Sequence, residues 1–190
     1  MQTLYLSNSS EPIHRSDLHP LSGDAIFQKK RGKPLVAIGA YCLMPNHFHL
    51  LLQEITENGI SRFMQKVGTA YAMYFNIKND RVGGLFVKPF RSKFIGDDRY
   101  VRRVAQYIHL NPAELYEPEW KSGQAHDIRT LQNKMLAYRY SSLPDYFGVE
   151  RAESRILDPG VRTVIADGLP ALGSLLSDAS EYYKELGVSN

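Results

Sequence analysis

The spacing of apolar residues divides the first part of the chain into segments with different predicted structures. Residues 1–33 mix Ser, Asn, Pro and Gly with charged residues and have little periodicity, which predicts an irregular arm. The unbroken apolar run 35–42 predicts a strand that is buried on both faces. The Met-Pro-Asn sequence at 44–46 predicts a turn, because proline fixes φ and asparagine tolerates the left-handed region. A second strand is expected at 47–53, so the two strands should form a hairpin.

Helical periodicity begins after this hairpin. Apolar residues recur at steps of three and four between Asn58 and Ile77, which indicates an amphipathic helix with a packed apolar stripe. The stripe consists of Ile60, Phe63, Met64, Val67, Tyr71, Tyr74 and Phe75. The segment 85–95 alternates aromatic and β-branched residues with basic ones, so one or two short strands are predicted there.

A second helix is expected to begin after Asp97 or Asp98, since aspartate is a preferred N-cap residue. This helix should end at Asn111, because the residue before a proline is disfavoured in the α region. Further helices are predicted at 127–138 and 171–186, with a turn-rich aromatic loop at 140–148 between them.

The order of these elements indicates the fold class. Strands interleave with helices, and the strands are linked as a hairpin, which favours an α+β fold with a mainly antiparallel sheet. The predicted organisation is an N-terminal arm at 1–33, one domain at 34–148 and a C-terminal helical extension at 149–190.

Composition places the chain among ordinary globular proteins. Hydrophobic residues make up 43% and charged residues 23%, and no apolar run has the length that a membrane span requires. The N-terminus also lacks the layout of a signal peptide, so a cytoplasmic location is predicted. The single cysteine, Cys42, cannot form an internal disulfide, which fits a reducing compartment.

The net charge of +3 is compatible with nucleic acid but does not identify it. The positions of the basic residues are more informative, because they gather in three clusters. The clusters are Lys29, Lys30, Arg31 and Lys33; Lys88, Arg91 and Lys93; and Arg99, Arg102 and Arg103. Such clusters form either a solvated surface or a groove for phosphate groups. Lys88, Arg91, Lys93 and Arg103 are the candidates for contact with DNA.

Two histidines stand two residues apart in the second predicted strand. On a strand, His47 and His49 project to the same face, while Phe48 points to the other face. Two neutral imidazoles side by side are suitable ligands for a metal ion. The alternative is a pair of histidines that are satisfied by hydrogen bonds on a polar sheet face.

The helix that ends at Asn111 offers further chemistry. Tyr107 and Asn111 are four residues apart, so they lie on one helical face, and Arg103 lies one turn earlier on that face. An amide oxygen of Asn111 could complete a metal site, with the Tyr107 hydroxyl beside it. The alternative is that Tyr107 packs in the core and Asn111 only terminates the helix.

Two motifs in this chain resemble those of a known family. The residues Tyr-Cys-Leu-Met-Pro-Asn-His-Phe-His-Leu-Leu-Leu at 41–52 resemble the HUH signature of single-tyrosine transposases (transposase IS200-like), especially the branch of the REP-associated tyrosine transposases. The residues Tyr-Ile-His-Leu-Asn-Pro at 107–112 are similar to the helix that carries the nucleophile in that branch. The stretch 138–142 also fits the layout, and the resemblance covers about 35–148.

The resemblance implies a ferredoxin-like core and a metal-dependent nuclease that cuts and rejoins single-stranded or hairpin DNA. It implies that His47 and His49 bind Mg²⁺ or Mn²⁺, that Asn111 is the third ligand, and that Tyr107 is the nucleophile of a 5′-phosphotyrosine intermediate.

Tyr100 lies two turns before Tyr107 on a similar face, but the position one turn after it is Val104, which cannot bind a metal. Tyr100 is therefore expected to be structural, as are Tyr71 and Tyr74, which lie on or beside the apolar stripe of their helix.

One departure from the family pattern affects these expectations. Members of the family open with a strand and a helix, and residues 1–33 contain neither in recognisable form, which suggests a core lacking its first strand and helix and a truncated start. A missing strand would leave an exposed sheet edge, and such edges favour association of two copies, so a homodimer is expected.

Two other functions remain to be weighed against the transposase. A histidine-triad nucleotide hydrolase would need a third histidine where Leu51 stands, so the sequence disfavours it. An inactive nucleic-acid-binding module, derived from a transposase by truncation, is the second alternative.

Overall fold

The computed structural model describes residues 1–12, 22–86, 89–122 and 127–185. The chain divides into two compact units. The first unit consists of Met1–Ile38 and Leu52–Phe94, and the second of Gly39–Leu51 and Ile95–Asn190.

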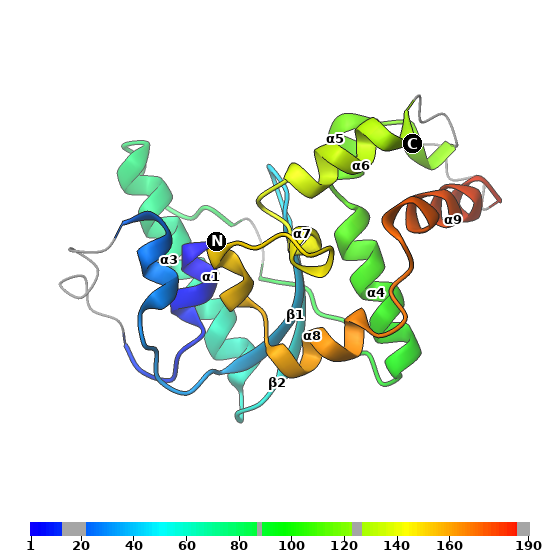
Figure 1. Ribbon diagram of the computed structural model, residues 1–190. Coiled ribbons are helices and arrows are strands. Elements are labelled where there is room, and N and C mark those ends of the chain that lie inside the picture. Colours follow the sequence, from blue (N-terminus) through cyan, green and yellow to red (C-terminus); the bar gives the residue numbers. More distant parts are fainter. Residues whose placement is uncertain (13–21, 87–88, 123–126, 186–190) are drawn as a thin grey trace. The chain divides into compact units, whose positions relative to one another are not determined.

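The predicted hairpin is present and runs through both units. Strand β1 spans Val36–Leu43 and is buried along almost its whole length, as the continuous apolar run predicts. Strand β2 spans Phe48–Glu54, and Figure 1 shows the two strands side by side. The Met44 amide donates to the His47 carbonyl at 2.8 Å, which closes the predicted turn.

The other edge of β1 is partly paired within the second unit. The Leu43 amide donates to the Tyr140 carbonyl at 2.8 Å, and the Ser142 amide donates to the Tyr41 carbonyl at 2.9 Å. Gly39 allows helix α8 (Pro159–Ala166) to approach the strand, because a Cβ at this position would lie 2.7 Å from Val161 Cγ1.

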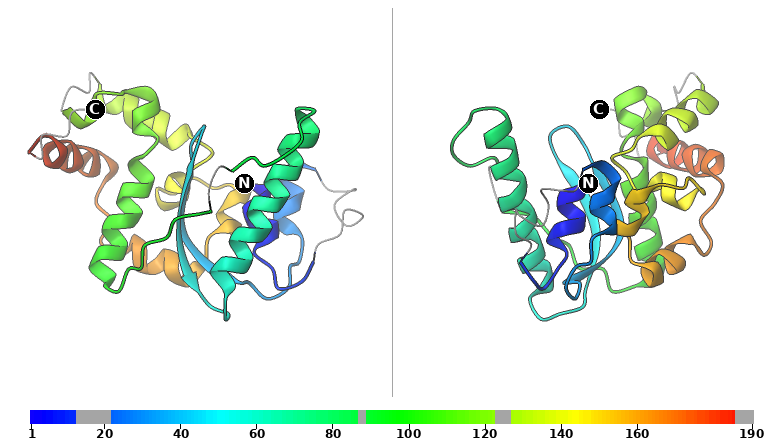
Figure 2. Two further views of the ribbon diagram at one scale, coloured as in Figure 1. Left: turned by 180° about the vertical axis from the view of Figure 1, so that it is seen from behind. Right: turned by 60° about the vertical axis from the view of Figure 1, so that its left-hand side comes forward.

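The prediction of an irregular N-terminal arm is wrong for part of its length. Helix α1 spans Gln2–Ser7 and packs against α3 (Gly59–Lys78), and the 3-10 helix η1 spans Gly23–Gln28 (Figure 2). The buried Asn8 side chain accepts from the Leu35 amide at 2.8 Å and donates to the Val36 carbonyl at 2.8 Å. The polar composition of this segment is typical of a loop, but here buried polar groups are satisfied by backbone groups.

Helix α3 matches its predicted span, but its apolar stripe is buried only in the first half. The buried residues of α3 end at Val67, whereas Tyr71 and Tyr74 are 40% and 55% exposed. The prediction that these two tyrosines pack in the core is therefore wrong. The helical period predicts which residues line up along one side of α3. Burial of these residues depends on a neighbouring element, and within the described part of the first unit only the N-terminal half of the stripe is buried.

The strands predicted at 85–95 are absent from the described residues of that segment, 85–86 and 89–95. Phe86 is 45% exposed and Phe94 is 91% exposed. Aromatic and β-branched residues favour strands only where a neighbouring strand and a packed face are present. This segment has neither in the described part of its unit, so its propensity is not realised.

The second unit is built mainly from helices. They are α4 (Asp98–Leu110), α5 (Ala113–Tyr116), η2 (Trp120–Ser122), α6 (Ile128–Ala137), α7 (Leu143–Tyr146), η3 (Ala152–Ile156), α8 and α9 (Leu172–Glu185). The spans of α4, α6 and α9 agree with the sequence predictions. Asp97 caps α4 by accepting from the Arg99 amide at 2.9 Å, and Asp127 caps α6 in the same way.

Two apolar clusters stabilise this unit. One joins the hairpin to α4 and α8, and it contains Ala40, Cys42, Leu51, Ala105, Ile108 and Ile165. The other packs α5, α6 and α9 together and contains Trp120, Leu131, Met135, Leu172, Leu175 and Leu176. Helix α4 contributes to both clusters through Ile108 and Leu110, so its position is fixed by packing on two sides.

The end of α4 differs from the sequence prediction in one respect. The helix ends at Leu110 as expected, but Asn111 keeps helical dihedral angles of φ −52° and ψ −40°. Pro112 follows with φ −62° and ψ −19° and leads directly into α5. The preference of pre-proline residues for extended backbone is overridden here, because Asn111, Pro112 and Ala113 are all buried.

The architecture is α+β with an antiparallel sheet and flanking helices, which confirms the predicted fold class. The two strands in the described residues are consistent with a ferredoxin-like core that lacks some of its elements. Within the same residues, no helix is both long enough and apolar enough to cross a membrane.

A buried ion pair ties the loop after α7 to the hairpin. Arg151 donates to both carboxylate oxygens of Asp145, whose side chain is completely buried. The same guanidinium donates to the Tyr41 hydroxyl at 3.1 Å and to the Arg139 carbonyl at 2.8 Å. Because the charged groups are fully hydrogen-bonded, removal of one partner would leave a buried charge without compensation.

We expect Arg151→Met to lower the free energy of unfolding by about 3–5 kcal/mol, since the Asp145 carboxylate would remain buried and unpaired. The matched control is Arg102→Met, which removes a more exposed guanidinium 3.7 Å from the Asp167 carboxylate. Surface pairs of this kind contribute about 1 kcal/mol or less. Urea denaturation of both variants measures the difference, and equal losses would contradict the assignment of a buried pair.

Candidate functional site

The two histidines of the hairpin lie together, as their spacing predicts. The ring centroids of His47 and His49 are 4.9 Å apart, and the ring planes are nearly perpendicular. His47 lies just before β2 and is exposed, while His49 lies in the strand and is partly buried. Leu51 continues the same face of the strand and packs in the cluster that contains Ile108 of α4. The histidine face of the hairpin is thus the face that α4 covers.

A neighbouring side chain determines which nitrogen of His47 faces outward. His47 Nδ1 lies 2.7 Å from Asn46 Oδ1. Because an amide oxygen can only accept, Nδ1 is the donor in this pair, and in a neutral ring the lone pair is then on Nε2. An imidazole that is oriented in this way is prepared to bind a metal through Nε2.

His49 has a different environment. Its Nε2 atom is buried and has no hydrogen-bond partner within the described structure. Burial lowers the pKa of His49, the neighbouring His47 lowers it further, and Glu114 and the Asn111 side chain act in the opposite direction. A lowered pKa keeps the ring in the neutral form that metal ions require.

Helix α4 places Tyr107 beside this pair. The ring centroid of Tyr107 is 5.5 Å from that of His49, and the tyrosine side chain is 46% exposed. The alternative that Tyr107 packs in the core is therefore excluded. Tyr100, two turns earlier, is 39% exposed, so exposure alone does not separate the two tyrosines.

Asn111 lies one turn after Tyr107 and is fixed by the helix itself. Its Nδ2 atom donates to the Tyr107 carbonyl at 2.8 Å. This contact uses the donor end of the amide and leaves Oδ1 as the end that can accept. The Asn111 side chain also acts to raise the pKa of His49.

Sequence reasoning did not single out Glu114, whose charge acts to raise the pKa of His49. Glu114 lies in α5, and its carboxylate forms an ion pair with Lys121. The spacing of seven residues from Tyr107 could have indicated a shared helical face. This spacing was not recognised as helical, because the helix was expected to end at Asn111.

The buried His109 holds α4 against β1 from the opposite side of the helix. Its Nε2 atom lies 2.8 Å from the Ser142 hydroxyl, which also accepts from the Tyr41 amide at 2.9 Å and donates to the Tyr41 carbonyl at 3.2 Å. The hydroxyl proton is used by that carbonyl, so His109 Nε2 is the donor. Burial lowers the pKa of His109 to about 3, and the ring is neutral.

The candidate residues for contact with DNA belong to different units. Arg91 and Lys93 are exposed in the first unit, and Arg103 is exposed on α4 in the second. Lys88 lies outside the described residues. Their roles stay predictions.

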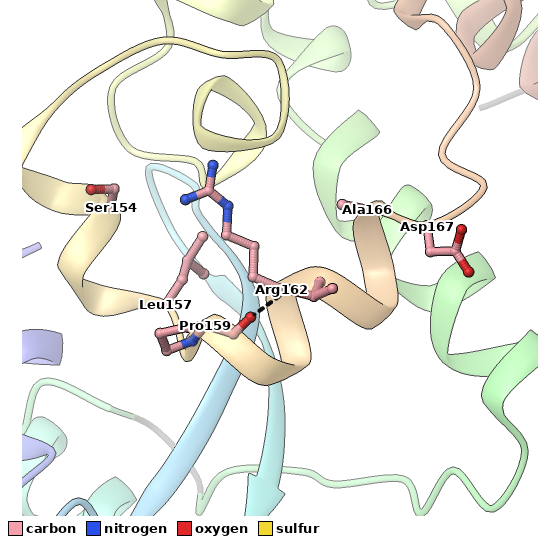
Figure 3. A pocket seen from close by; sticks show the side chains of 7 residues that line it. Ser154, Leu157, Pro159, Arg162, Ala166 and Asp167 are labelled. Atoms are coloured by element: carbon pink, nitrogen blue, oxygen red, sulfur yellow. Dashed lines mark hydrogen bonds between the residues drawn. The ribbon is translucent and has the colours of Figure 1, made fainter.

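A surface hollow lies between η3 and α8 (Figure 3), and its lining contains none of the candidate residues named above. It is lined by residues of 154–167 that include Leu157, Arg162 and Asp167. The Arg162 guanidinium donates to the Asp145 carbonyl, and the Thr163 hydroxyl donates to the Pro159 carbonyl at 2.9 Å. These polar groups are already paired inside the protein, so the hollow offers little for a ligand.

A metal ion could not be held here by acidic and imidazole side chains alone. No group of three or more His, Cys, Asp or Glu side chains in the described residues has the geometry of a metal site. A metal site that used His47 and His49 would need a ligand of another kind, and the Asn111 amide is the candidate from the sequence. The cysteine takes no part, because burial raises the pKa of the Cys42 thiol to about 12.

Comparison with known protein families gives a match to part of the chain. Residues 21–111 match the family model described as transposase IS200-like. The match includes the hairpin, α3, α4 and Asn111, so it contains both histidines and Tyr107. This segment, slightly less than half of the chain, is therefore similar to IS200-like transposases. Comparison with curated proteins and with solved structures gave no match.

We expect stability to fall below pH 6.5 because of His109. The unfolded chain takes up a proton near pH 6.5, whereas the folded His109 stays neutral down to about pH 3. Between these values, His109 makes the free energy of unfolding decrease by up to about 1.4 kcal/mol per pH unit as the pH falls. His109→Gln keeps an N–H donor but does not titrate, so unfolding curves of this variant should show a smaller slope. Identical slopes for both proteins would contradict the assignment.

Proposed function

We propose that this protein is a metal-dependent single-stranded DNA endonuclease and strand transferase, of the branch of the REP-associated tyrosine transposases. The observation that carries the proposal is the position of Tyr107, 5.5 Å from His49 and on the same helical face as Asn111. The similarity of residues 21–111 to IS200-like transposases supports a transposase.

The residues present fit a divalent metal ion, either Mg²⁺ or Mn²⁺. His47 Nε2, His49 Nε2 and Asn111 Oδ1 would hold it. The fit rests on the buried His49 Nε2 atom, which has no partner in the described structure, and on the orientation of His47 by Asn46. When bound, such an ion supplies Lewis-acid polarisation of a phosphate group.

In the proposed reaction, the oxygen of Tyr107 attacks the scissile phosphorus in line. The bond between phosphorus and the 3′-oxygen breaks, the tyrosine loses its proton, and the departing 3′-oxygen gains one. The product is a 5′-phosphotyrosine link and a free 3′-hydroxyl. Attack by another 3′-hydroxyl reverses these steps and joins strands, since the link retains the phosphodiester energy.

The single-stranded substrate would be held by cations and aromatic rings. Arg91, Lys93 and Arg103 supply exposed positive charge, and Lys88 is a further candidate by sequence. Phe90 and Phe94 stand next to two of these cations and are 44% and 91% exposed. Phosphate contacts combined with stacked bases are the usual means of binding unpaired strands.

The substitution Tyr107→Phe should abolish the covalent protein–DNA adduct with little change in stability, because it removes one oxygen from a half-exposed ring. The adduct is measured on denaturing gels after incubation with Mn²⁺ and a single-stranded oligonucleotide that carries the flanking DNA of the gene. Tyr100→Phe is the matched control and should form the adduct normally. Persistence of the adduct in Tyr107→Phe would overturn the assignment.

The same assay distinguishes an active transposase from an inactive nucleic-acid-binding module. If the unmodified protein binds the oligonucleotide but forms no adduct with any metal, it is an inactive nucleic-acid-binding module. If His47→Ala still forms the adduct, the proposed metal site is wrong.

Replacement of Arg91 and Lys93 by glutamine should weaken binding of single-stranded DNA and reduce its dependence on salt. Each lost phosphate contact lowers the slope of log K against log salt concentration by about 0.7. The control Arg129→Gln removes an exposed cation of α6, outside the matched segment, and should leave the slope unchanged. Phe94→Leu should lower affinity without a change of slope, because stacking involves no counterions. A salt titration by fluorescence anisotropy measures all three.

A further inference from the structure

Two tyrosines lie beside the end of β1, next to the turn that carries the first histidine. The Leu43 amide donates to the Tyr140 carbonyl at 2.8 Å, and the Tyr138 hydroxyl donates to the Leu43 carbonyl at 2.6 Å. The turn begins at the next residue, and a hydrogen bond from the Met44 amide to the His47 carbonyl closes it. The positions of both tyrosines relative to this turn are therefore fixed by hydrogen bonds to a single residue of β1.

A third tyrosine extends these two into a row. Tyr116 lies at the end of α5, and its ring centroid is 6.4 Å from that of Tyr138, which is 5.8 Å from that of Tyr140. The interplanar angles of 85° and 69° are typical of edge-to-face contacts. The tyrosine row, Tyr116, Tyr138 and Tyr140, thus begins on the element that follows the helix of Tyr107 and ends beside the hairpin, within the second unit.

Tyr140 is the most accessible member of the tyrosine row. It is 47% exposed, whereas Tyr116 and Tyr138 are partly buried. The hydroxyl of Tyr138 is held by the Leu43 carbonyl, so this ring is a fixed support for its neighbour. Because nearly half of Tyr140 stays accessible beside this support, its ring can receive a further flat group.

Two cations flank the tyrosine row. The Lys134 ammonium lies 5.7 Å from the ring centroid of Tyr116, and the Arg139 guanidinium lies 5.8 Å from that of Tyr140. Lys134 is exposed and forms no ion pair with a carboxylate of the described residues. Arg139 donates to the buried Glu153 carboxylate at 3.1 Å, which orients the guanidinium, while the arginine side chain stays 64% exposed. Both cations are therefore accessible to a phosphate group.

Aromatic rings beside exposed cations match the chemistry of an unpaired nucleic-acid strand. Its bases stack on ring faces whatever their sequence, and its phosphates contact the cations. In a duplex the neighbouring pairs cover the faces of each base, so a single ring can receive only an unpaired base. A protein partner would need a wider apolar surface, whereas the residues that follow Tyr140, 141–145, are buried.

We propose that Tyr140 stacks on an unpaired base of the substrate strand, and that Lys134 and Arg139 contact phosphates of the same strand. The inference rests on the proposed function, because it names a contact of the same DNA. It places a stacking residue in the unit that contains Tyr107. A base that is held beside the hairpin turn restricts the path of the strand next to the histidines.

The test is binding of the full chain to a fluorescent single-stranded oligonucleotide that carries the flanking DNA of the gene, measured by anisotropy in EDTA. We expect Tyr140→Leu to weaken binding roughly 5- to 150-fold, the loss that corresponds to one stacked base. Tyr140→Phe keeps the ring and should bind as the unmodified chain does. The matched control is Tyr100→Leu, which removes a ring of similar exposure outside the tyrosine row and should leave affinity unchanged.

A second measurement identifies the stacked base from the side of the DNA. The oligonucleotide is prepared with an abasic site at each position in turn. At one position the abasic site should weaken binding of the unmodified chain as much as Tyr140→Leu does, and it should cost that variant nothing further. If Tyr140→Leu does not fold, Tyr140→Trp retains a test, because stacking should quench its indole fluorescence except with that abasic oligonucleotide.

The contribution of charge is tested at Lys134. The substitution Lys134→Gln should lower the slope of log K against log salt concentration by about 0.7, since one phosphate contact is lost. Arg129→Gln removes another exposed cation of α6 and should leave the slope unchanged. Arg139 is kept intact in this comparison, because its loss would leave the Glu153 carboxylate buried without its partner.

The outcomes distinguish this inference from the proposed function. If Tyr140→Leu and every abasic site leave affinity unchanged while Tyr107→Phe abolishes the adduct, the stacking role is wrong and the proposed function stands. If both lower affinity but the unmodified chain forms no adduct, the stacking role stands and the transposase activity fails. Equal weakening of duplex binding by Tyr140→Leu would overturn stacking on an unpaired base, as would a change of oligomeric state in that variant. If the unmodified chain binds no single-stranded DNA, both proposals fail.

Discussion

The hydroxyl group of Ser142 makes the contact on which the candidate site depends. It hydrogen-bonds to both backbone groups of Tyr41 in β1 and to the His109 ring in α4. The histidine pair belongs to the hairpin, whereas Tyr107 belongs to α4, so the two halves of the site face each other only if these elements stay in register. The buried hydroxyl acts together with the backbone pairing of β1 and residues 140–142 and extends that register to α4.

The surroundings of this contact explain why it can be buried. Asp145 and Arg151 neutralise each other next to Ser141 and Tyr41, and the guanidinium satisfies the backbone carbonyl groups of the same loop. His109 is neutral and therefore adds no charge. His109 Nε2 links α4 to this network, while Ile108 and Ala105 pack the remainder of the interface.

The predictions from sequence succeeded where local periodicity decides the structure and failed where distant packing does. The hairpin and α4 follow from apolar spacing, proline and capping residues, all of which act within a few positions. The segment 85–95 has strand propensity but no neighbouring strand in the described part of its unit, and Tyr71 stays 40% exposed on its stripe although the Phe86 ring lies 6.3 Å from it. Asn8 was overlooked because the hydrogen bonds that bury it join residues about thirty positions apart.

The sequence by itself determined that His47 and His49 share a strand face and that Tyr107 and Asn111 share a helical face, because the periods of strand and helix are properties of the local backbone. Only the tertiary structure decided that these two faces meet, that His49 is partly buried, and that this burial lowers its pKa. These properties depend on distances and desolvation between residues that are remote along the chain. Packing of the tertiary structure sets these distances and this desolvation, and a local sequence pattern cannot predict either.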